Sequence, residues 1–250
     1  MSYNDLRDLD LAGIRWELTD VPMTRAATMP ATPTAEPDAP HAHDDNTPNI
    51  VPPMAPMGLD VARAAAMRPT DAGALARLVA EFNHPLRRGA TNPVPPHVAP
   101  NPNGLVVITD MPGADDDASG VVLSGAAGEL MDKMLSAIGM GRDNVSIVPL
   151  LFWRTPGGRA PSRVELDLAR PFVYRAIELL APRVILTLGT MSATEIAHAT
   201  LPKDHGAVIS RDGGGVIVPI FHPNYLLLKP AAKRDAWNAL QQVQNLLKSA

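Results

Sequence analysis

Two polar residues stand where chemistry is expected, each directly after a short apolar run. Asp110 follows the run Leu105–Thr109, and His222 follows the run Val216–Phe221. A carboxylate can stabilise positive charge or position a water molecule, and a histidine can donate a hydrogen bond near neutral pH. Both also have a structural interpretation, because an aspartate after a strand often caps a helix or loop and a histidine before proline can be a satisfied turn residue.

The segments after the apolar runs are rich in proline, glycine and polar residues. They cover residues 110–117, 152–159, 189–192 and 222–228. Parallel α/β sheets bind ligands outside the carboxyl ends of their strands, so we expect these segments to form one site. Three consecutive acids, Asp115–Asp117, could indicate a cation site, but adjacent acids point in different directions and more often begin a helix. No metal site is therefore expected.

Short apolar, β-branched runs predict four strands, at Leu105–Thr109, Val145–Leu150, Val184–Leu188 and Val216–Phe221. Helical patterns at Gly125–Ile138, Ser162–Leu180, Thr190–Ala199 and Ala231–Leu247 alternate with them or follow them, and one or two further helices are expected between residues 60 and 82. Ser162 with Glu165 three residues later forms a capping-box pattern. Crossovers of this length join parallel strands, and nearly all-apolar strands are covered on both faces. The predicted fold is α/β, with three αβα layers and a four-stranded parallel sheet.

The N-terminal part of the chain differs from the rest. Residues 22–58 are rich in proline and alanine and lack periodicity, which predicts a disordered linker. Before it, Leu6, Leu9, Ile14 and Trp16 predict a short amphipathic helix, which we expect to dock on the main domain or on a partner. The predicted domains are residues 1–58 and residues 59–250.

Composition excludes several classes of protein. The 250 residues include no cysteine, which excludes disulfides, thiolate metal sites and cysteine-ligated iron–sulfur clusters. The sequence contains no run of roughly 18 apolar residues, so no membrane span is expected. The absence of an apolar signal core favours a cytoplasmic location. The net charge is −4. It is unevenly distributed, because residues 1–140 carry 9 Lys and Arg against 18 Asp and Glu, whereas residues 141–250 carry 13 against 8.

The ordered set of segments resembles the uracil-DNA glycosylase superfamily, and within it the iron–sulfur type called family 4. Residues Thr109–Gly128 follow the register of the family motif GEAPG-x-x-E-D-x-x-G. RTPGGRAP at Arg154–Pro161 is similar to RPPGNR-x-P, and HPNYLL at His222–Leu227 is similar to HP-A/S-x-LL. The resemblance covers residues 71–247 and implies the excision of uracil or another deaminated base from DNA. It also implies a repair protein as the partner of the N-terminal segment.

This resemblance also implies roles for particular residues. Asp110 would act on the sugar side of the broken bond and His222 on the base side. Pro112 and Gly113 would let the backbone approach a phosphate or the base. The residues implied to contact DNA are the polar Arg154, Arg159, Asn224, Lys229 and Lys233, together with Leu226 and Leu227, which would wedge into the duplex.

The chain departs from the family at the positions that would hold the iron–sulfur cluster and at those that would bind the excised base. Two cluster positions fall at Trp153 and Ala169, with His84 near a third, so we expect apolar packing in place of the cluster, no cofactor and a monomeric protein. Among the residues implied to bind the base, the family's stacking Phe falls at Leu123 and its uracil-reading Asn at Pro149. The alternative function is therefore a non-catalytic DNA-binding or repair-interaction relative with the same fold.

Overall fold

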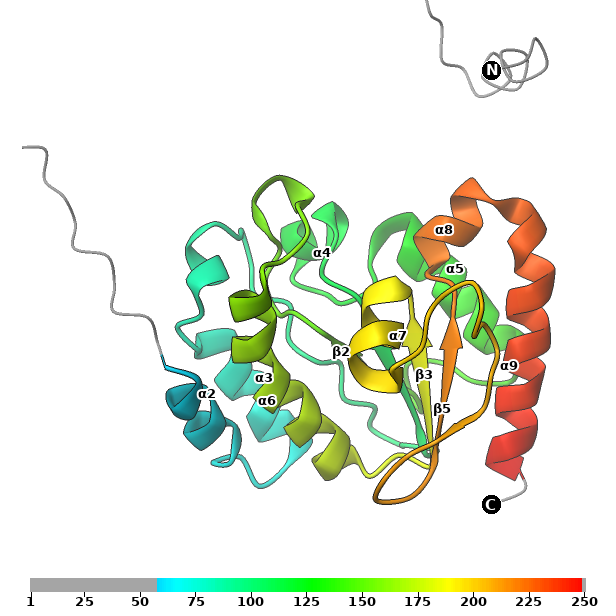
Figure 1. The fold of residues 1–250 in the computed structure, drawn as a ribbon, viewed down its shortest axis with the longest axis horizontal. Coiled ribbons are helices and arrows are strands. Elements are labelled where there is room, and N and C mark those ends of the chain that lie inside the picture. Colours follow the sequence, from blue (N-terminus) through cyan, green and yellow to red (C-terminus); the bar gives the residue numbers. More distant parts are fainter. Residues whose placement is uncertain (1–57, 249–250) are drawn as a thin grey trace, which may run out of the picture. The chain divides into compact units, whose positions relative to one another are not determined.

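The computed structural model describes residues 58–248, and Figure 1 shows their fold. These residues lie in one compact unit. The amphipathic helix and the linker predicted before residue 58 lie outside the described residues and stay predictions. Within the described range, no helix is both long and apolar enough to cross a membrane.

A five-stranded sheet forms the centre of the fold, with its strands in the order β2-β1-β3-β5-β4. The strands are β1 (Leu105–Thr109), β2 (Ser146–Pro149), β3 (Val184–Leu188), β4 (Ile209–Ser210) and β5 (Val216–Ile220). β1, β2, β3 and β5 pair in parallel, which confirms the four parallel strands predicted from the apolar runs. The sequence does not predict β4, which pairs antiparallel to β5, because two residues are too few to show an alternating pattern.

Helices cover both faces of this sheet and complete the predicted three layers (Figure 1). Successive side chains of a strand point to opposite faces, so Val106 and Ile108 of β1 join one hydrophobic core whereas Leu105 and Val107 join the other. The first core is closed by α2 (Leu59–Ala66), α3 (Ala72–Glu81), α6 (Arg163–Leu180) and α7 (Thr190–Ala197). The second core is closed by α5 (Gly125–Ala137) and α9 (Lys233–Lys248).

Short elements follow the carboxyl ends of the parallel strands and build the predicted site. The helix α4 (Ala114–Ser119) comes after β1, the 3-10 turn η2 (Pro156–Gly158) after β2, and the helix α8 (Pro223–Leu228) after β5. Two further 3-10 turns, η1 (Pro85–Arg88) and η3 (Pro230–Ala232), precede β1 and α9. The four segments expected to carry chemistry therefore lie at the same edge of the sheet.

Candidate active site

A cavity of about 680 Å³ lies at the carboxyl ends of the parallel strands. Its wall includes Asp110, Arg154, Gly189 and His222, one from each of the segments that follow β1, β2, β3 and β5. This is the edge at which α/β sheets bind ligands. A larger cavity of about 1170 Å³ lies at the opposite edge, where β3 and β5 begin. None of the four segments expected to carry chemistry lines it, so the smaller cavity is the candidate site.

The carboxylate of Asp110 is held by the first turn of α7. The Ser192 N–H donates to its Oδ1 at 2.6 Å, and the Met191 N–H lies 3.4 Å from its Oδ2. Burial raises the pKa of Asp110 above its ordinary value, while these donors and the nearby His222 oppose the rise. Asp110 thus caps a helix, as its structural interpretation predicts, and it also lines the cavity. Its catalytic role stays a prediction.

Gly189 makes the close approach of Asp110 to α7 possible. Its φ is +102°, in the region that favours glycine. A Cβ atom at this position would lie 2.3 Å from Oδ2 of Asp110. Any other residue would therefore displace either the carboxylate or the start of α7, a requirement that the sequence pattern alone does not reveal.

The imidazole of His222 is held by a hydrogen bond at each ring nitrogen. Its Nδ1 accepts from the Asn224 N–H at 3.2 Å, and its Nε2 lies 3.1 Å from Oγ1 of Thr109. Because Nδ1 accepts from an amide, the neutral ring carries its proton on Nε2 and donates it to Thr109. Burial lowers the pKa of His222, against the opposing charges of Asp110 and Asp116. The cavity wall therefore holds a neutral N–H donor.

Two of the three consecutive acids of α4 bind backbone amides. Asp116 accepts from the N–H groups of Ser124 at 2.7 Å and Gly113 at 3.0 Å, and Asp117 accepts from the Thr91 N–H at 2.8 Å. Both carboxylates are buried. In the part of the chain that the structure describes, no group of three or more His, Asp or Glu side chains is arranged to hold a metal ion. These acids fix the loops around the cavity.

Pro112 and Gly113 lie in the cavity wall, as the predicted contact with a base or phosphate requires. Gly113 has a φ of −78°, and the nearest atom to a Cβ at this position would be 3.8 Å away. The protein alone therefore does not need glycine here. The close approach of DNA at this position stays a prediction.

The two positions to which the resemblance assigns base-contacting side chains have different surroundings. Leu123 is buried and lines the cavity, and its φ is +52°. Pro149 is the last residue of β2, is buried, and pairs with Thr109 of β1. It is not among the residues that line the cavity. The structure thus brings Leu123 to the site but leaves Pro149 in the sheet.

The leucines after His222 differ in exposure. Leu226 is 1% exposed and Leu227 is 41% exposed. A buried side chain cannot enter a duplex without leaving its packing, so a wedge at Leu226 would require α8 to rearrange and stays a prediction. Leu228, which the motif does not single out, is 79% exposed and lines the cavity. Of the three leucines of α8, Leu227 and Leu228 are therefore the exposed ones.

The polar residues predicted to contact DNA also separate by position. Arg154 and Asn224 line the cavity, and Lys229 and Lys233 are exposed beyond α8. Arg159 is not among the residues that line the cavity. Its guanidinium instead forms an ion pair with Glu165, in which Nη2 lies 2.6 Å from Oε1. A phosphate at Arg159 would have to compete with that carboxylate.

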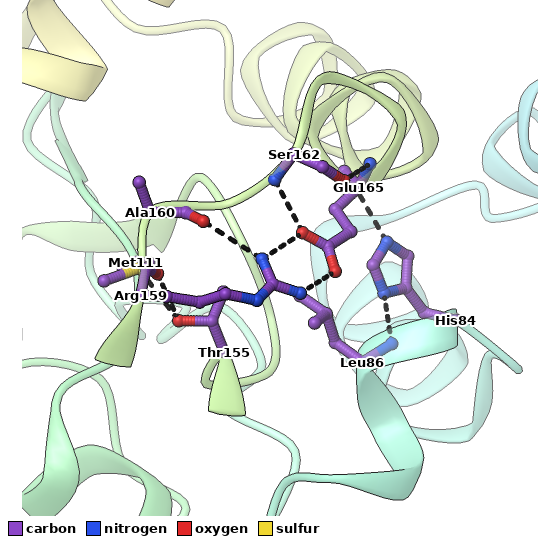
Figure 2. A network of polar contacts seen from close by, with 8 residues as sticks. All are labelled: His84, Leu86, Met111, Thr155, Arg159, Ala160, Ser162 and Glu165. Carbon is purple, nitrogen blue, oxygen red and sulfur yellow. Dashed lines mark hydrogen bonds and ion pairs between the residues drawn. The ribbon is translucent and has the colours of Figure 1, made fainter. Parts of the chain in front are cut away.

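The positions that the resemblance assigns to iron–sulfur ligands do not fit a cluster. Trp153, Ala169 and His84 are fully buried, and the rings of His84 and Trp153 stack with their centroids 4.8 Å apart. Both ring nitrogens of His84 are occupied, Nε2 by the Glu165 carbonyl oxygen at 3.1 Å and Nδ1 by the Leu86 N–H at 3.2 Å (Figure 2). Cluster ligation needs thiolates, which this chain lacks. Packed rings and backbone hydrogen bonds fill this region.

The ion pair of Arg159 and Glu165 fastens the loop after β2 to the start of α6 (Figure 2). Glu165 also accepts from the Ser162 N–H at 2.7 Å and donates its own N–H to Ser162 Oγ at 3.3 Å, which confirms the predicted capping box. The Thr155 hydroxyl donates to the Arg159 carbonyl at 2.5 Å and lies 3.5 Å from Sδ of Met111. Met111 lines the cavity, so this network supports one of its walls.

We expect Glu165→Gln to lower the free energy of unfolding at pH 7 by about 1–2 kcal/mol, because the ion pair is only partly shielded from water. The Arg159 guanidinium lowers the pKa of Glu165 from 4.5 to about 2. A depressed carboxyl pKa stabilises the fold above the ordinary value and loses this effect as the pH falls towards the folded value. The difference between wild type and variant should therefore shrink from pH 5 to pH 3, as measured by urea unfolding.

The matched control for this prediction is Glu178→Gln on the same helix. Glu178 pairs with Arg175, but its side chain is 60% exposed, so its replacement should change the free energy of unfolding very little. An effect of Glu165→Gln that is equal at pH 7 and pH 3 would contradict the ion-pair explanation.

The fold and the cavity define a three-layer α/β protein whose site is assembled from the loops at the carboxyl ends of a parallel sheet. Residues 95–241 match the uracil DNA glycosylase superfamily, and the chain belongs to this family, as the ordered motifs predicted. It is 29% identical over 170 residues to a type-4 uracil-DNA glycosylase of Archaeoglobus fulgidus, covering 64% of this chain and 85% of the relative. It is 31% identical over 141 residues to a type-4 uracil-DNA glycosylase of Pyrobaculum aerophilum, covering 53% and 72%.

Proposed function

We propose that the protein is a DNA glycosylase that removes uracil or another deaminated base by hydrolysing the N-glycosidic bond, a step of base excision repair. Family membership and the relatives named type-4 uracil-DNA glycosylases support this proposal. The observation that carries it is a single cavity whose wall holds both the ionisable carboxylate of Asp110 and the neutral imidazole of His222. These two groups suit the two ends of the bond that breaks.

The reaction requires opposite charges to be stabilised at the same time. A base must first leave the stack, because its glycosidic bond cannot be reached there. As the bond breaks, positive charge develops on the sugar and negative charge on the departing base. Asp110, whose orientation is fixed by the Ser192 amide, stabilises the sugar or positions the attacking water.

His222 serves the base side of the bond through Nε2–H. In the free protein this group is 3.1 Å from Thr109 Oγ1, and the oxygen of an extruded base takes over the hydrogen bond. Protonation of Nδ1 would place two donors face to face, because that atom accepts from the Asn224 N–H. The neutral ring is therefore the form that donates to the developing anion.

DNA binding should be weak and sensitive to salt, because few cations surround the cavity. If Arg154, Lys229 and Lys233 neutralise three phosphates, log K should fall against log salt concentration with a slope of roughly −2 to −3. The double variant Lys229→Ala/Lys233→Ala should have a slope smaller by about 1–2, as measured by fluorescence anisotropy.

Lys248 provides the control for the salt measurement, since it lies at the far end of α9 from the cavity (Figure 1). Lys248→Ala should leave the slope unchanged. A wild-type slope near zero, or an equal effect of both changes, would contradict the placement of DNA over α8.

A non-catalytic DNA-binding relative is the second candidate function. It is favoured by the replacements at Leu123 and Pro149, where the family's stacking ring and uracil-reading amide are missing. This candidate predicts DNA binding with the same salt dependence but no excision.

Single-turnover excision separates the two candidates. Excess protein is incubated with oligonucleotides that contain uracil, hypoxanthine or xanthine, and strand breakage at the abasic product is followed after alkali. The glycosylase proposal predicts slow excision of at least one of these bases. Binding of all three oligonucleotides without strand breakage would reject it in favour of the DNA-binding relative.

A further inference from the structure

Tyr225 presents an exposed ring beside the candidate catalytic pair. It lies three residues after His222 in α8, lines the same cavity and is 44% exposed. Leu123 provides no ring inside this cavity. Among the described residues that line it, the aromatic carbon rings belong to Phe221 and Tyr225.

Two further rings support Tyr225 from one side. The Tyr225 and Phe221 ring centroids are 4.7 Å apart at an interplanar angle of 34°, and those of Phe221 and His205 are 4.2 Å apart at 36°. Burial lowers the pKa of His205, which favours its neutral imidazole against Phe221. The row restricts the Tyr225 ring while leaving a large part of it in contact with solvent.

Cations and an exposed apolar side chain lie in or next to the cavity wall that holds this ring. Lys229 lies one helical turn further on, where its N–H donates to the Tyr225 carbonyl at 2.8 Å, and Arg154 lines the cavity. Leu228, which directly precedes Lys229, is 79% exposed and also lines the cavity. An aromatic ring beside cations is the combination that binds single-stranded nucleic acid, with bases stacked on the ring and phosphates near the cations.

We propose that Tyr225 is a stacking platform for a nucleobase of the DNA strand that enters the cavity. This inference rests on the proposed function for its ligand. Tyr225 is more exposed than Asp110 and His222, which are both partly buried. The base that stacks on it is therefore the neighbour of the extruded base, which itself sits deeper, against His222. Tyr225 adds affinity without taking part in bond breakage.

The test uses a single-stranded oligonucleotide in which 2-aminopurine stands next to 2′-fluoro-2′-deoxyuridine, whose glycosidic bond resists cleavage. Affinity is measured by the anisotropy of a dye at the 5′ end. Stacking is measured separately by 2-aminopurine fluorescence, which an adjacent aromatic ring quenches. Wild type is compared with Tyr225→Phe, Tyr225→Leu and Tyr174→Leu. Tyr174 is the matched control, since it is 43% exposed on α6 and lines the cavity at the opposite edge of the sheet.

Tyr225→Leu should weaken binding by about 5- to 100-fold and give a brighter 2-aminopurine signal at saturating protein than wild type. Tyr225→Phe and Tyr174→Leu should match wild type in both measurements. Circular dichroism and the thermal midpoint show whether Tyr225→Leu is folded. If the leucine variant unfolds, Tyr225→Phe still tests the ring, because loss of quenching in Tyr225→Phe would overturn the proposal.

Equal affinity and equal quenching in wild type and folded Tyr225→Leu would overturn the stacking role while leaving excision intact. Binding and quenching without excision of uracil, hypoxanthine or xanthine from cleavable oligonucleotides would instead reject the glycosylase function and support the platform. The absence of binding by wild type at low salt would overturn both.

Discussion

Replacing Asp110 by asparagine should slow the chemical step of excision by on the order of 10²-fold or more. Asparagine keeps the size of the side chain and one oxygen for the Ser192 N–H, which donates to Asp110 at 2.6 Å. It removes the negative charge that faces the sugar as positive charge develops. The rate is measured under single-turnover conditions, so that product release does not mask the change.

The pH dependence provides a second signature of the same carboxylate. Burial raises the pKa of Asp110 above 3.8, so the wild-type rate should rise with pH over a range above that of an exposed aspartate. Asp110→Asn should lack this rise. A carboxyl group with a raised folded pKa destabilises the protein as it ionises, so the variant should not unfold at a lower temperature at pH 7.

Asp115→Asn is the matched control for Asp110, because Asp115 also lines the cavity but is exposed in α4. Its replacement should change the rate only slightly. A loss equal to that of Asp110→Asn would show that the net charge of the cavity, and not the position of one carboxylate, controls the rate.

Removing the imidazole of His222 should slow excision by roughly 10- to 100-fold, with little change in DNA affinity. His222→Ala removes the donor to the departing base, but it also removes the side chain that accepts from the Asn224 N–H at the start of α8. Loss of a helix cap costs about 1 kcal/mol. Activity and stability therefore have to be separated.

His222→Asn makes this separation, because asparagine is a good helix cap but is too short to replace Nε2–H. We expect it to recover the thermal midpoint lost in His222→Ala while its single-turnover rate stays as low. If His222→Asn recovered the rate along with the midpoint, the role of His222 would be structural.

Strong local patterns made most of the fold predictable. The four parallel strands are uninterrupted apolar runs, and the capping box of Ser162 and Glu165 is a short-range signal that survives in the structure. The rule that ligands bind at the carboxyl ends of parallel strands places Asp110 and His222 together without any knowledge of their contacts. Both residues line one cavity.

The contacts within the site depend on distances that no local pattern contains. The Thr109–His222 hydrogen bond joins residues 113 positions apart, and the need for glycine at position 189 follows from the approach of Asp110. Three consecutive leucines in α8 give no sign of which faces inward, so the resemblance implies a DNA contact for Leu226 although this side chain is buried. The exposure of Tyr225 and Leu228 becomes clear only once the structure shows which side of this short helix faces the core.

The most direct test of the proposed function compares wild type and Asp110→Asn side by side on single-stranded oligonucleotides that contain uracil, hypoxanthine or xanthine. Protein is in excess, the pH is 7.5, and the fraction of abasic product is followed over time. The glycosylase proposal predicts slow, complete excision of at least one of these bases by wild type and a rate at least about 10²-fold lower for the variant, with DNA affinity unchanged. Equal residual rates for the two proteins would contradict it, and the chain would then be a DNA-binding relative without catalytic activity.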